Sequence, residues 1–142
     1  METGRRIVKK LSMVIAGIAA ATMAYAENLN DVDKMICAAS QVQICIEDDT
    51  CYAATPEDLG IPDFVVIDTD KQTISTTKAS ELNRSTAFSA ASKVDGLIYL
   101  QGIEGGRAFS FVIDEATGRM TVSVARDGFS VSVFGVCTDT DL

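Results

Sequence analysis

Apolar and polar residues alternate along most of the segment from residue 97 to residue 137, and each alternating run ends at a turn that contains glycine. Because successive side chains of a β-strand point to opposite faces of a sheet, this alternation predicts strands with one buried face. Asp127-Gly128 lies between two such runs and is a strong hairpin signal, since a type I′ turn requires a positive φ at both central residues. A two-residue loop at this point pairs Val122 with Val133.

Two further loops extend the expected register. A four-residue loop over residues 115–118 places Phe111 opposite Val122, and a two-residue loop that begins at Glu104 places Ile98 opposite Phe111. All three loops agree on which residues share one apolar face of four consecutive strands. That face is expected to hold Ile98, Leu100, Phe109, Phe111, Val122, Val124, Val131 and Val133. The segment therefore predicts an antiparallel meander.

The first part of the chain after the leader is ambiguous. Residues 29–46 fit both a helical face and a strict alternation of apolar residues. The β-branched residues near the end of this segment favour a strand from Ile36 to Ile46. A short helical turn capped by Asn30 or Asp31 can precede that strand.

Three weaker strand signals follow. The segments Phe64–Asp68 and Gln72–Thr76 are expected to form a hairpin. The segment Arg84–Ser92 is rich in serine and alanine and predicts a strand that turns at Asp95-Gly96 into the meander. Residues 27–142 are therefore expected to form a single all-β domain of about eight or nine antiparallel strands. A meander with one apolar face must cover that face, so we expect a small closed or nearly closed barrel.

The first 26 residues have the three parts of a secretory signal peptide. Leu11–Met23 is an apolar stretch, and Ala24-Tyr25-Ala26 is a small-x-small cleavage site. The alternative is a retained membrane anchor, although a span requires about 20 apolar residues. The basic residues that precede the apolar stretch are Arg5, Arg6, Lys9 and Lys10. We therefore expect residues 1–26 to be removed and the mature protein to be periplasmic or secreted, with no membrane insertion.

Removal of this leader makes the chain strongly acidic. The leader holds four of the 12 basic residues and one of the 20 acidic residues, so residues 27–142 hold 8 basic and 19 acidic residues and a net charge of −11. Such a charge repels polyanions, which argues against nucleic acids and anionic membrane surfaces as partners. It is compatible with a cationic protein partner, or it keeps a small exported domain soluble.

Four cysteines in an exported chain predict two disulfides, for which three connectivities exist. Cys45 and Cys51 flank a polar segment suited to a turn, so a bridge across that hairpin is expected, and it leaves Cys37 to pair with Cys137. A zinc site is the alternative, but the chain has no C-x2-C pair and no histidine. We expect no metal and no cofactor.

The composition also excludes most catalytic templates. Without histidine the chain has no Ser-His or Cys-His pair, and oxidised cysteines cannot act as nucleophiles. Ser75 and Lys78 match an S-x-x-K motif, but the S-D-N and K-T-G elements that accompany it in penicillin-recognising enzymes are missing. The carboxylates gather in expected turns, where aspartate is favoured for local hydrogen bonds. No catalytic residue is predicted.

A possible binding rim is the remaining site. Arg126 and Phe129 are expected to face each other beside the Asp127-Gly128 turn, where the arginine can stack over the ring. Tyr99 and Arg107 are expected near the same kind of rim. These four residues either protect the end of the barrel or form the mouth of a pocket.

Several segments carry a family resemblance. They are the C-x7-C-x5-C start, I-P-D-F-V-V-I-D, Q-G-I-E-G-G-R-A-F-S, I-D-E-A-T-G-R-M-T and the F-G-V-C end. Together they resemble a group of small exported bacterial proteins of unknown function with two disulfides, over nearly the whole mature chain. The resemblance implies no catalytic or binding residue. In architecture the expected barrel is similar to lipocalins and to periplasmic lysozyme inhibitors, although the S-G-x-x-Y loop of the inhibitors is missing.

These observations favour a non-enzymatic binding module, for a cationic protein or for a small apolar ligand. The alternatives are a structural protein of the cell envelope without a ligand and a carboxylate-dependent hydrolase. A cavity of several hundred Å3 inside the barrel favours a ligand. An interior filled by Phe109, Phe111, Ile98 and Leu100 does not.

Overall fold

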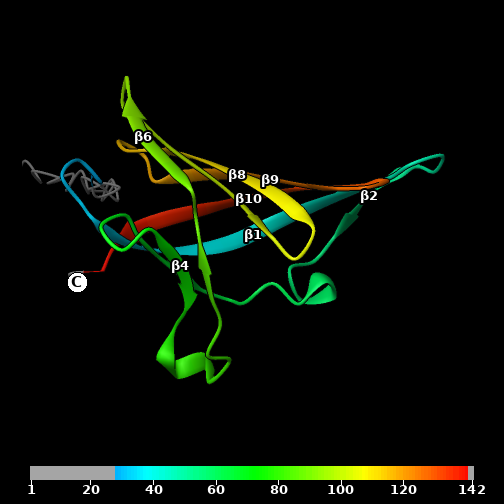
Figure 1. Ribbon diagram of the computed structural model, residues 1–142, viewed down its shortest axis with the longest axis horizontal. Coiled ribbons are helices and arrows are strands. Elements are labelled where there is room, and N and C mark those ends of the chain that lie inside the picture. The colour runs from blue at the N-terminus through cyan, green and yellow to red at the C-terminus, as the bar shows by residue number, and fades with distance from the viewer. Residues whose placement is uncertain (1–27, 141–142) are drawn as a thin grey trace, which may run out of the picture.

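The computed structural model describes residues 28–140, in which ten β-strands form one curled antiparallel sheet (Figure 1). The strands are β1 (Lys34–Ile46), β2 (Cys51–Ala54), β3 (Val65–Asp68), β4 (Thr73–Thr76), β5 (Ser85–Ala87), β6 (Ala90–Val94), β7 (Leu97–Glu104), β8 (Arg107–Asp114), β9 (Arg119–Arg126) and β10 (Phe129–Asp139). Two short 3-10 helices, η1 (Glu57–Leu59) and η2 (Lys78–Ser80), lie in the connections. The strand order is β5-β4-β3-β1-β10-β9-β8-β7-β6, and β2 pairs with β1 beside β3. The fold is thus all-β, as predicted.

The long strands β1 and β10 lie side by side at the centre of the sheet (Figure 1). The predicted strand from Ile36 to Ile46 is confirmed, and the expected helical turn before it is wrong, because residues 30–31 form a turn and the strand begins at Lys34. A bulge between Ala39 and Gln41 inserts one residue. Buried positions therefore change from odd to even numbers along β1, which explains why two periodicities fitted the same segment.

The meander has the predicted faces and most of the predicted pairs. Val122 lies opposite Val133 and Phe111 opposite Val122, as the loops at Asp127-Gly128 and 115–118 predicted. The third loop differs, because Gly105 and Gly106 form the turn with φ of 56° and 75°. These two glycines meet the type I′ requirement without steric cost, so Glu104 stays in the strand. The register moves by two residues, and the pairs of this hairpin are Ile98 with Ile113, Leu100 with Phe111 and Gly102 with Phe109.

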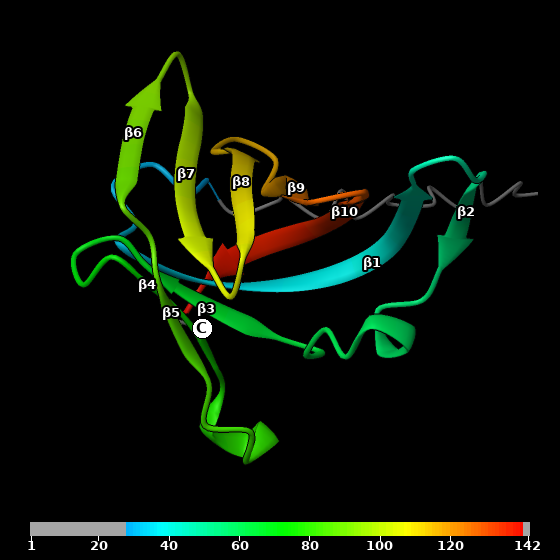
Figure 2. The ribbon, with the colours of Figure 1, turned by 45° about the vertical axis from the view of Figure 1, so that its right-hand side comes forward.

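The expected closure of the barrel is wrong. The sheet curls into a half-barrel whose edge strands β5 and β6 form no ladder with each other, although the two residues Phe88-Ser89 connect them along the chain (Figure 2). The predicted single strand Arg84–Ser92 is therefore two strands, of which β5 pairs with β4 and β6 pairs with β7. The backbone N–H of Phe88 donates to the carbonyl of Gln72, and that of Ser89 to the carbonyl of Gln101. The connection thus ties the two edges together at Phe88-Ser89.

The interior is tightly packed at one end and only partly filled at the other, where Ile44 and Val131 are buried but Val124 in the same row is partly exposed. Ile98 and Leu100 are fully buried in β7, as is Ile113 in β8. The inner face of these strands ends in the exposed residues Glu104 and Arg107 at the opposite end. The buried core around the packed end further includes Leu29, Met35, Val42, Ile67, Met120, Val122 and Val133. We call the other end of the half-barrel its open end.

Both disulfides form as predicted. Cys37 and Cys137 lie directly opposite each other in the β1–β10 ladder, with Cα atoms 4.0 Å apart. Cys45 and Cys51 close the β1–β2 hairpin with a Cα separation of 4.1 Å. Disulfides persist in oxidising compartments, so they indicate a location outside the cytoplasm.

Within residues 28–140 no helix is long and apolar enough to span a bilayer, and the predicted leader, residues 1–26, lies outside the described part of the chain.

Candidate functional site

The open end of the half-barrel holds a pocket. Two overlapping hollows of about 610 and 260 Å3 meet there. Ligand sites are typically concavities of about 300–1,000 Å3, so the combined space has the size of a small-molecule site. The residues common to both hollows are Pro62, Ile74, Arg84, Thr86, Glu104 and Arg107. We call this space the open-end pocket.

The floor of the pocket is the apolar inner face of β8 and β9. Phe109, Phe111 and Val124 line it and are only half-buried. The two phenylalanine rings contact each other edge to face, with centroids 6.0 Å apart and planes at 88°. Phe109 lies over Gly102 of β7, where a Cβ atom would come within 2.9 Å of the ring Cε1. A glycine at this position therefore leaves room for the ring to lie flat against the sheet.

One wall of the pocket is the end of η1 and the residues that follow it. Leu59 and Ile61 add apolar side chains to the lining. The start of this segment is fixed by a reciprocal pair of hydrogen bonds, in which the backbone N–H of Thr55 donates to the Asp58 carboxylate at 3.0 Å and that of Asp58 to the Thr55 hydroxyl at 3.3 Å. The hydrogen bond from the Thr55 backbone is the main cause that lowers the pKa of Asp58. Gly60 then adopts φ of 61° and turns the chain toward the pocket.

Arg84 projects into the pocket from the connection between η2 and β5. Its backbone is held by Thr76, whose hydroxyl accepts the Arg84 N–H at 3.0 Å and whose own N–H donates to the Arg84 carbonyl at 2.9 Å. The guanidinium donates through Nη2 to the carbonyl oxygen of Gly60 at 3.2 Å. Arg84 therefore connects the β4–β5 arm to the wall on the other side of the pocket.

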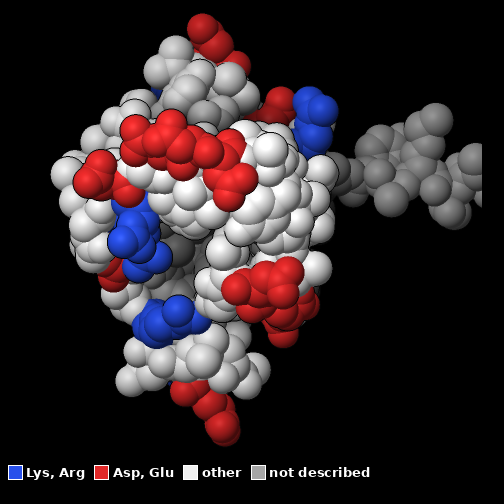
Figure 3. Space-filling view, turned by 90° about the vertical axis from the view of Figure 1, so that its right-hand side faces the viewer, with Lys and Arg blue, Asp and Glu red and all other residues white. Residues whose placement is uncertain are grey.

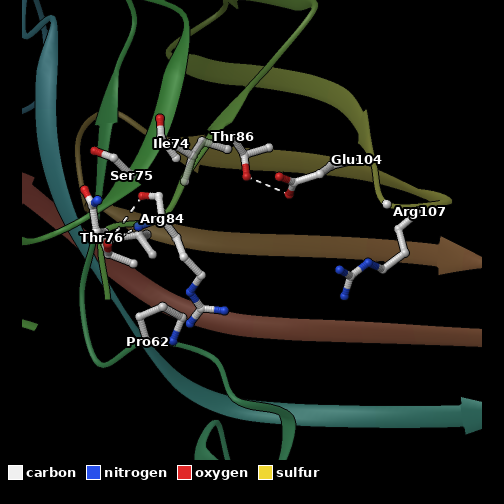
Figure 4. A pocket seen from close by; sticks show the side chains of 12 residues that line it. Pro62, Ile74, Ser75, Thr76, Arg84, Thr86, Glu104 and Arg107 are labelled. Carbon is white, nitrogen blue, oxygen red and sulfur yellow. Dashed lines mark hydrogen bonds between the residues drawn. The ribbon is translucent and has the colours of Figure 1, made fainter. Parts of the chain in front are cut away.

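Arg107 and Glu104 lie opposite each other at the β7–β8 turn, but the structure does not join them. Glu104 Oε2 accepts the hydroxyl of Thr86 at 2.6 Å, across the seam between β5 and β7. Within residues 28–140 no hydrogen bond or ion pair reaches the Arg107 guanidinium. Figure 4 shows Glu104 turned toward Thr86, and both arginine side chains pointing into the space between Pro62 and the strands. Two cationic groups and one anionic group therefore border the apolar floor.

The charge distribution at the open end agrees with this arrangement. Figure 3 looks onto this end and shows basic side chains on two sides of a hollow, with acidic side chains grouped farther out. Arg84 and Arg107 are the two basic residues that line the pocket. A mainly acidic protein thus places two arginines where an apolar surface is open to solvent.

The four residues of the predicted rim do not come together. Arg107 lines the open-end pocket. Arg126 and Phe129 lie opposite each other, as predicted, but they border a separate shallow hollow of about 350 Å3 with Glu47. Tyr99 lies on the other face of β7 from the buried Ile98 and Leu100. A binding role for Arg126, Phe129 and Tyr99 stays a prediction.

Other members of the pocket were missed from the sequence. The position of Glu104 follows from the alternation in β7, since it shares the parity of Ile98 and Leu100, but the assumed loop placed it in the turn. Arg84 gave no signal, because it lies in an irregular connection that only the curl of the sheet brings to the open end. A further hollow of about 720 Å3 lies beside η2, and it includes Arg84 but no residue of the inner face of β7–β10.

The open-end pocket offers one carboxylate beside two guanidinium groups. Glu104 is the one acidic residue in the lining of the open-end pocket, whereas glycoside hydrolysis requires two carboxyl groups about 5–10 Å apart. In the described part of the chain, no three histidine, cysteine or acidic side chains are grouped so that they could hold a metal ion. No protein-family model, curated protein or solved structure matches this chain.

Proposed function

We propose that this chain is an exported, non-enzymatic binding module that holds a small, mainly apolar molecule in the open-end pocket. The observation that carries this proposal is the apolar floor formed by Phe109, Phe111 and Val124, which pack against the core and are still partly exposed. Folding normally removes such side chains from water, at a gain of about 25 cal/mol per Å2 of apolar surface. A ligand over the floor would bury the surface that the fold leaves open. The two disulfides support a periplasmic or secreted location.

The alternative is a structural protein of the cell envelope without a ligand. Such a protein gains nothing from an unfilled space, because larger side chains on the floor would fill that space and improve the packing of the interior. The packed end shows that this sheet can fill its interior, since Leu100 is 0 % exposed and pairs directly with Phe111 of the floor. The hollow end is therefore better explained by a ligand than by a general inability of the half-barrel to close.

The direct test is native mass spectrometry of the protein purified from its own compartment. We expect a complex whose added mass is that of a small molecule, and the complex should be absent in Val124→Phe, because the larger ring would occupy the floor. Ser123→Phe is the matched control, since Ser123 is exposed on the other face of β9. Leu100 is not a suitable site for the filling substitution, because it lies in the packed core.

Two results would count against the proposal. A bound mass that persists in Val124→Phe would place the ligand outside the open-end pocket. A bound polypeptide that dissociates as salt rises would instead favour a cationic protein partner, because attraction at the acidic surface is screened over about 8–10 Å.

A further inference from the structure

We propose that the ligand of the open-end pocket is an anionic amphiphile whose carboxylate or phosphate group is held between Arg84 and Arg107 while its short apolar tail covers Phe109 and Phe111. This inference rests on the proposed function and names the chemistry of the ligand. The two guanidinium groups border the pocket from different elements, Arg84 from the arm before β5 and Arg107 from the start of β8 (Figure 4).

The free donors of the two arginines support an anionic group. A guanidinium has five N–H donors in a rigid fork, which matches the oxygens of carboxylate and phosphate. Arg84 uses one nitrogen for the carbonyl of Gly60, and Arg107 has no hydrogen-bond or ion-pair partner within residues 28–140. Most of the donors that point into the pocket are therefore available to a ligand.

Glu104 is the natural competitor for Arg107, because the two residues face each other across the β7–β8 ladder. Its carboxylate is instead bound to the Thr86 hydroxyl at 2.6 Å, on the side of β5. Thr86 thus holds the negative charge away from the arginines and ties the two edges of the half-barrel at the pocket. The pocket is thus lined by two cationic side chains and one anionic side chain, whereas residues 27–142 as a whole have a net charge of −11.

The inner hollow gives a scale for the tail, and it is open to solvent and continues into the larger hollow. A volume of about 260 Å3 holds about nine non-hydrogen atoms at the roughly 30 Å3 that each water molecule occupies in the liquid. A chain of about eight carbons therefore fills the floor and leaves its head group near the arginines. The acidic surface opposes the approach of anions at long range, so selectivity for the head group must come from direct contact with the two guanidinium groups.

The test compares four probes with the same eight-carbon tail by isothermal titration calorimetry: nonanoate, octyl phosphate, 1-octanol and octylamine. We expect nonanoate, octyl phosphate or both to bind at least about tenfold more tightly than 1-octanol, which is the gain typical of one charge-assisted contact. Octylamine should bind most weakly. The tighter of the two anions identifies the head group.

Variants assign the effect to the two arginines. R84Q and R107Q should each reduce the affinity for the tighter anion about tenfold and leave that for 1-octanol unchanged. R126Q is the matched control, because it removes the same charge at the open end from a residue that does not line the pocket. An equal loss of anion affinity in R126Q would show a general charge effect and overturn the proposal.

The probes also separate this inference from the proposed function. Equal affinities for 1-octanol and both anions would overturn the anionic head group and leave the apolar ligand in place. Tightest binding of octylamine would overturn it too, since Glu104 would then dominate. Failure of all four probes to bind would count against both proposals.

Discussion

Val122 and Ser123 are neighbours in β9 whose side chains meet different surroundings. Val122 is 5 % exposed in the core, whereas Ser123 is exposed on the other face. Val122→Asp should lower the free energy of unfolding by several kcal/mol, because it buries a charge without a partner. Ser123→Asp should change it by less than about 1 kcal/mol. Urea denaturation of both variants checks the difference, and similar losses on the two faces would contradict the register.

Gly135 in β10 lies where no other side chain fits. A Cβ atom there would collide with the carbonyl oxygen of Ala38 in β1 and come within 2.9 Å of Met120 Cε. Gly135→Ala should therefore destabilise the protein by about 1–3 kcal/mol through overpacking. Val136→Ala is the control, since Val136 is 56 % exposed, and it should cost clearly less in a thermal melt. A Gly135→Ala protein as stable as the wild type would mean that the two central strands can separate slightly.

Residue positions were predictable from the sequence where alternation and turn chemistry agree. The pairs of Val122 and Val133 follow from the two-residue loop at Asp127-Gly128, although only Gly128 has the positive φ that a type I′ turn requires at both positions. The pairs of Ile98 do not follow as surely, because both Glu104-Gly105 and Gly105-Gly106 can form a two-residue turn. The two alternatives differ by a register shift of two residues, which keeps every side chain on its face. Alternation alone therefore cannot distinguish them.

At the scale of elements, the β8–β9 turn depends on one carboxylate. Asp114 Oδ1 accepts the backbone N–H groups of Thr117 and Ala116, both at 2.9 Å. The bond from Thr117 is the largest cause that lowers the pKa of Asp114 below its ordinary 3.8. A carboxyl group whose pKa is lowered by folding stabilises the fold above its ordinary pKa, and this contribution is lost as the pH falls through the lowered value.

The turn therefore predicts a pH dependence. Asp114→Asn should be less stable than the wild type at about pH 6, and the difference should shrink as the pH falls from about 4 toward 2.5. Urea midpoints measured for both proteins across this range provide the check. A difference that stays constant or grows in acid would mean that the carboxylate does not stabilise this turn.

The two disulfides close loops of very different length. Cys37 and Cys137 are 100 residues apart in the chain, and Cys45 and Cys51 are 6 apart. In the loop-entropy model these closures stabilise the fold by about 5 and about 2 kcal/mol. The double variant C37A/C137A should therefore unfold at a clearly lower urea concentration than C45A/C51A. Equal losses would indicate that the unfolded chain is already compact, so that the long closure adds little.

The strands of the meander were predictable from the sequence. Strands were less predictable where the alternation of apolar and polar residues is interrupted. The strand over residues 36–46 contains a bulge, which shifts its buried positions by one residue and imitates a helical period. The segment 84–92 was expected to be one strand, but it crosses between sheet edges at Phe88-Ser89. Nothing in its serine- and alanine-rich composition marks that crossing.

At the scale of the whole molecule, closure could not be predicted, because it depends on how far the sheet curls and not on any local pattern. An apolar face must be covered, but the packed end satisfies this need with Leu29 and Phe88, which lie outside the strands. The candidate site could not be predicted from the sequence for the same reason, because it also depends on the curl of the sheet. Of its charged residues, only Arg107 was expected at a rim, since Arg84 reaches the pocket through the curl.

The predicted signal peptide implies that the exported protein lacks residues 1–26. We expect the exported chain to begin at Glu27, so its intact mass should correspond to residues 27–142 with two disulfides. Ala26→Arg should leave uncleaved precursor, because the residue before the cleaved bond must be small. Exported wild-type protein that retains residues 1–26 would contradict the soluble form and favour a membrane anchor.

The ladder between β1 and β10 determines when the chain can fold. All 11 residues of β10 pair with β1, which is made nearly a hundred residues earlier. Until β10 is synthesised, β1 has only β2 and β3 as ladder partners, and Cys37 lacks its native partner Cys137. Sheets whose contacts are so distant in sequence fold slowly, over milliseconds to seconds. The sheet therefore cannot be completed before β10 is made, and a chain exported through a translocation channel, as we propose, would still lack its central ladder while most of it is threaded.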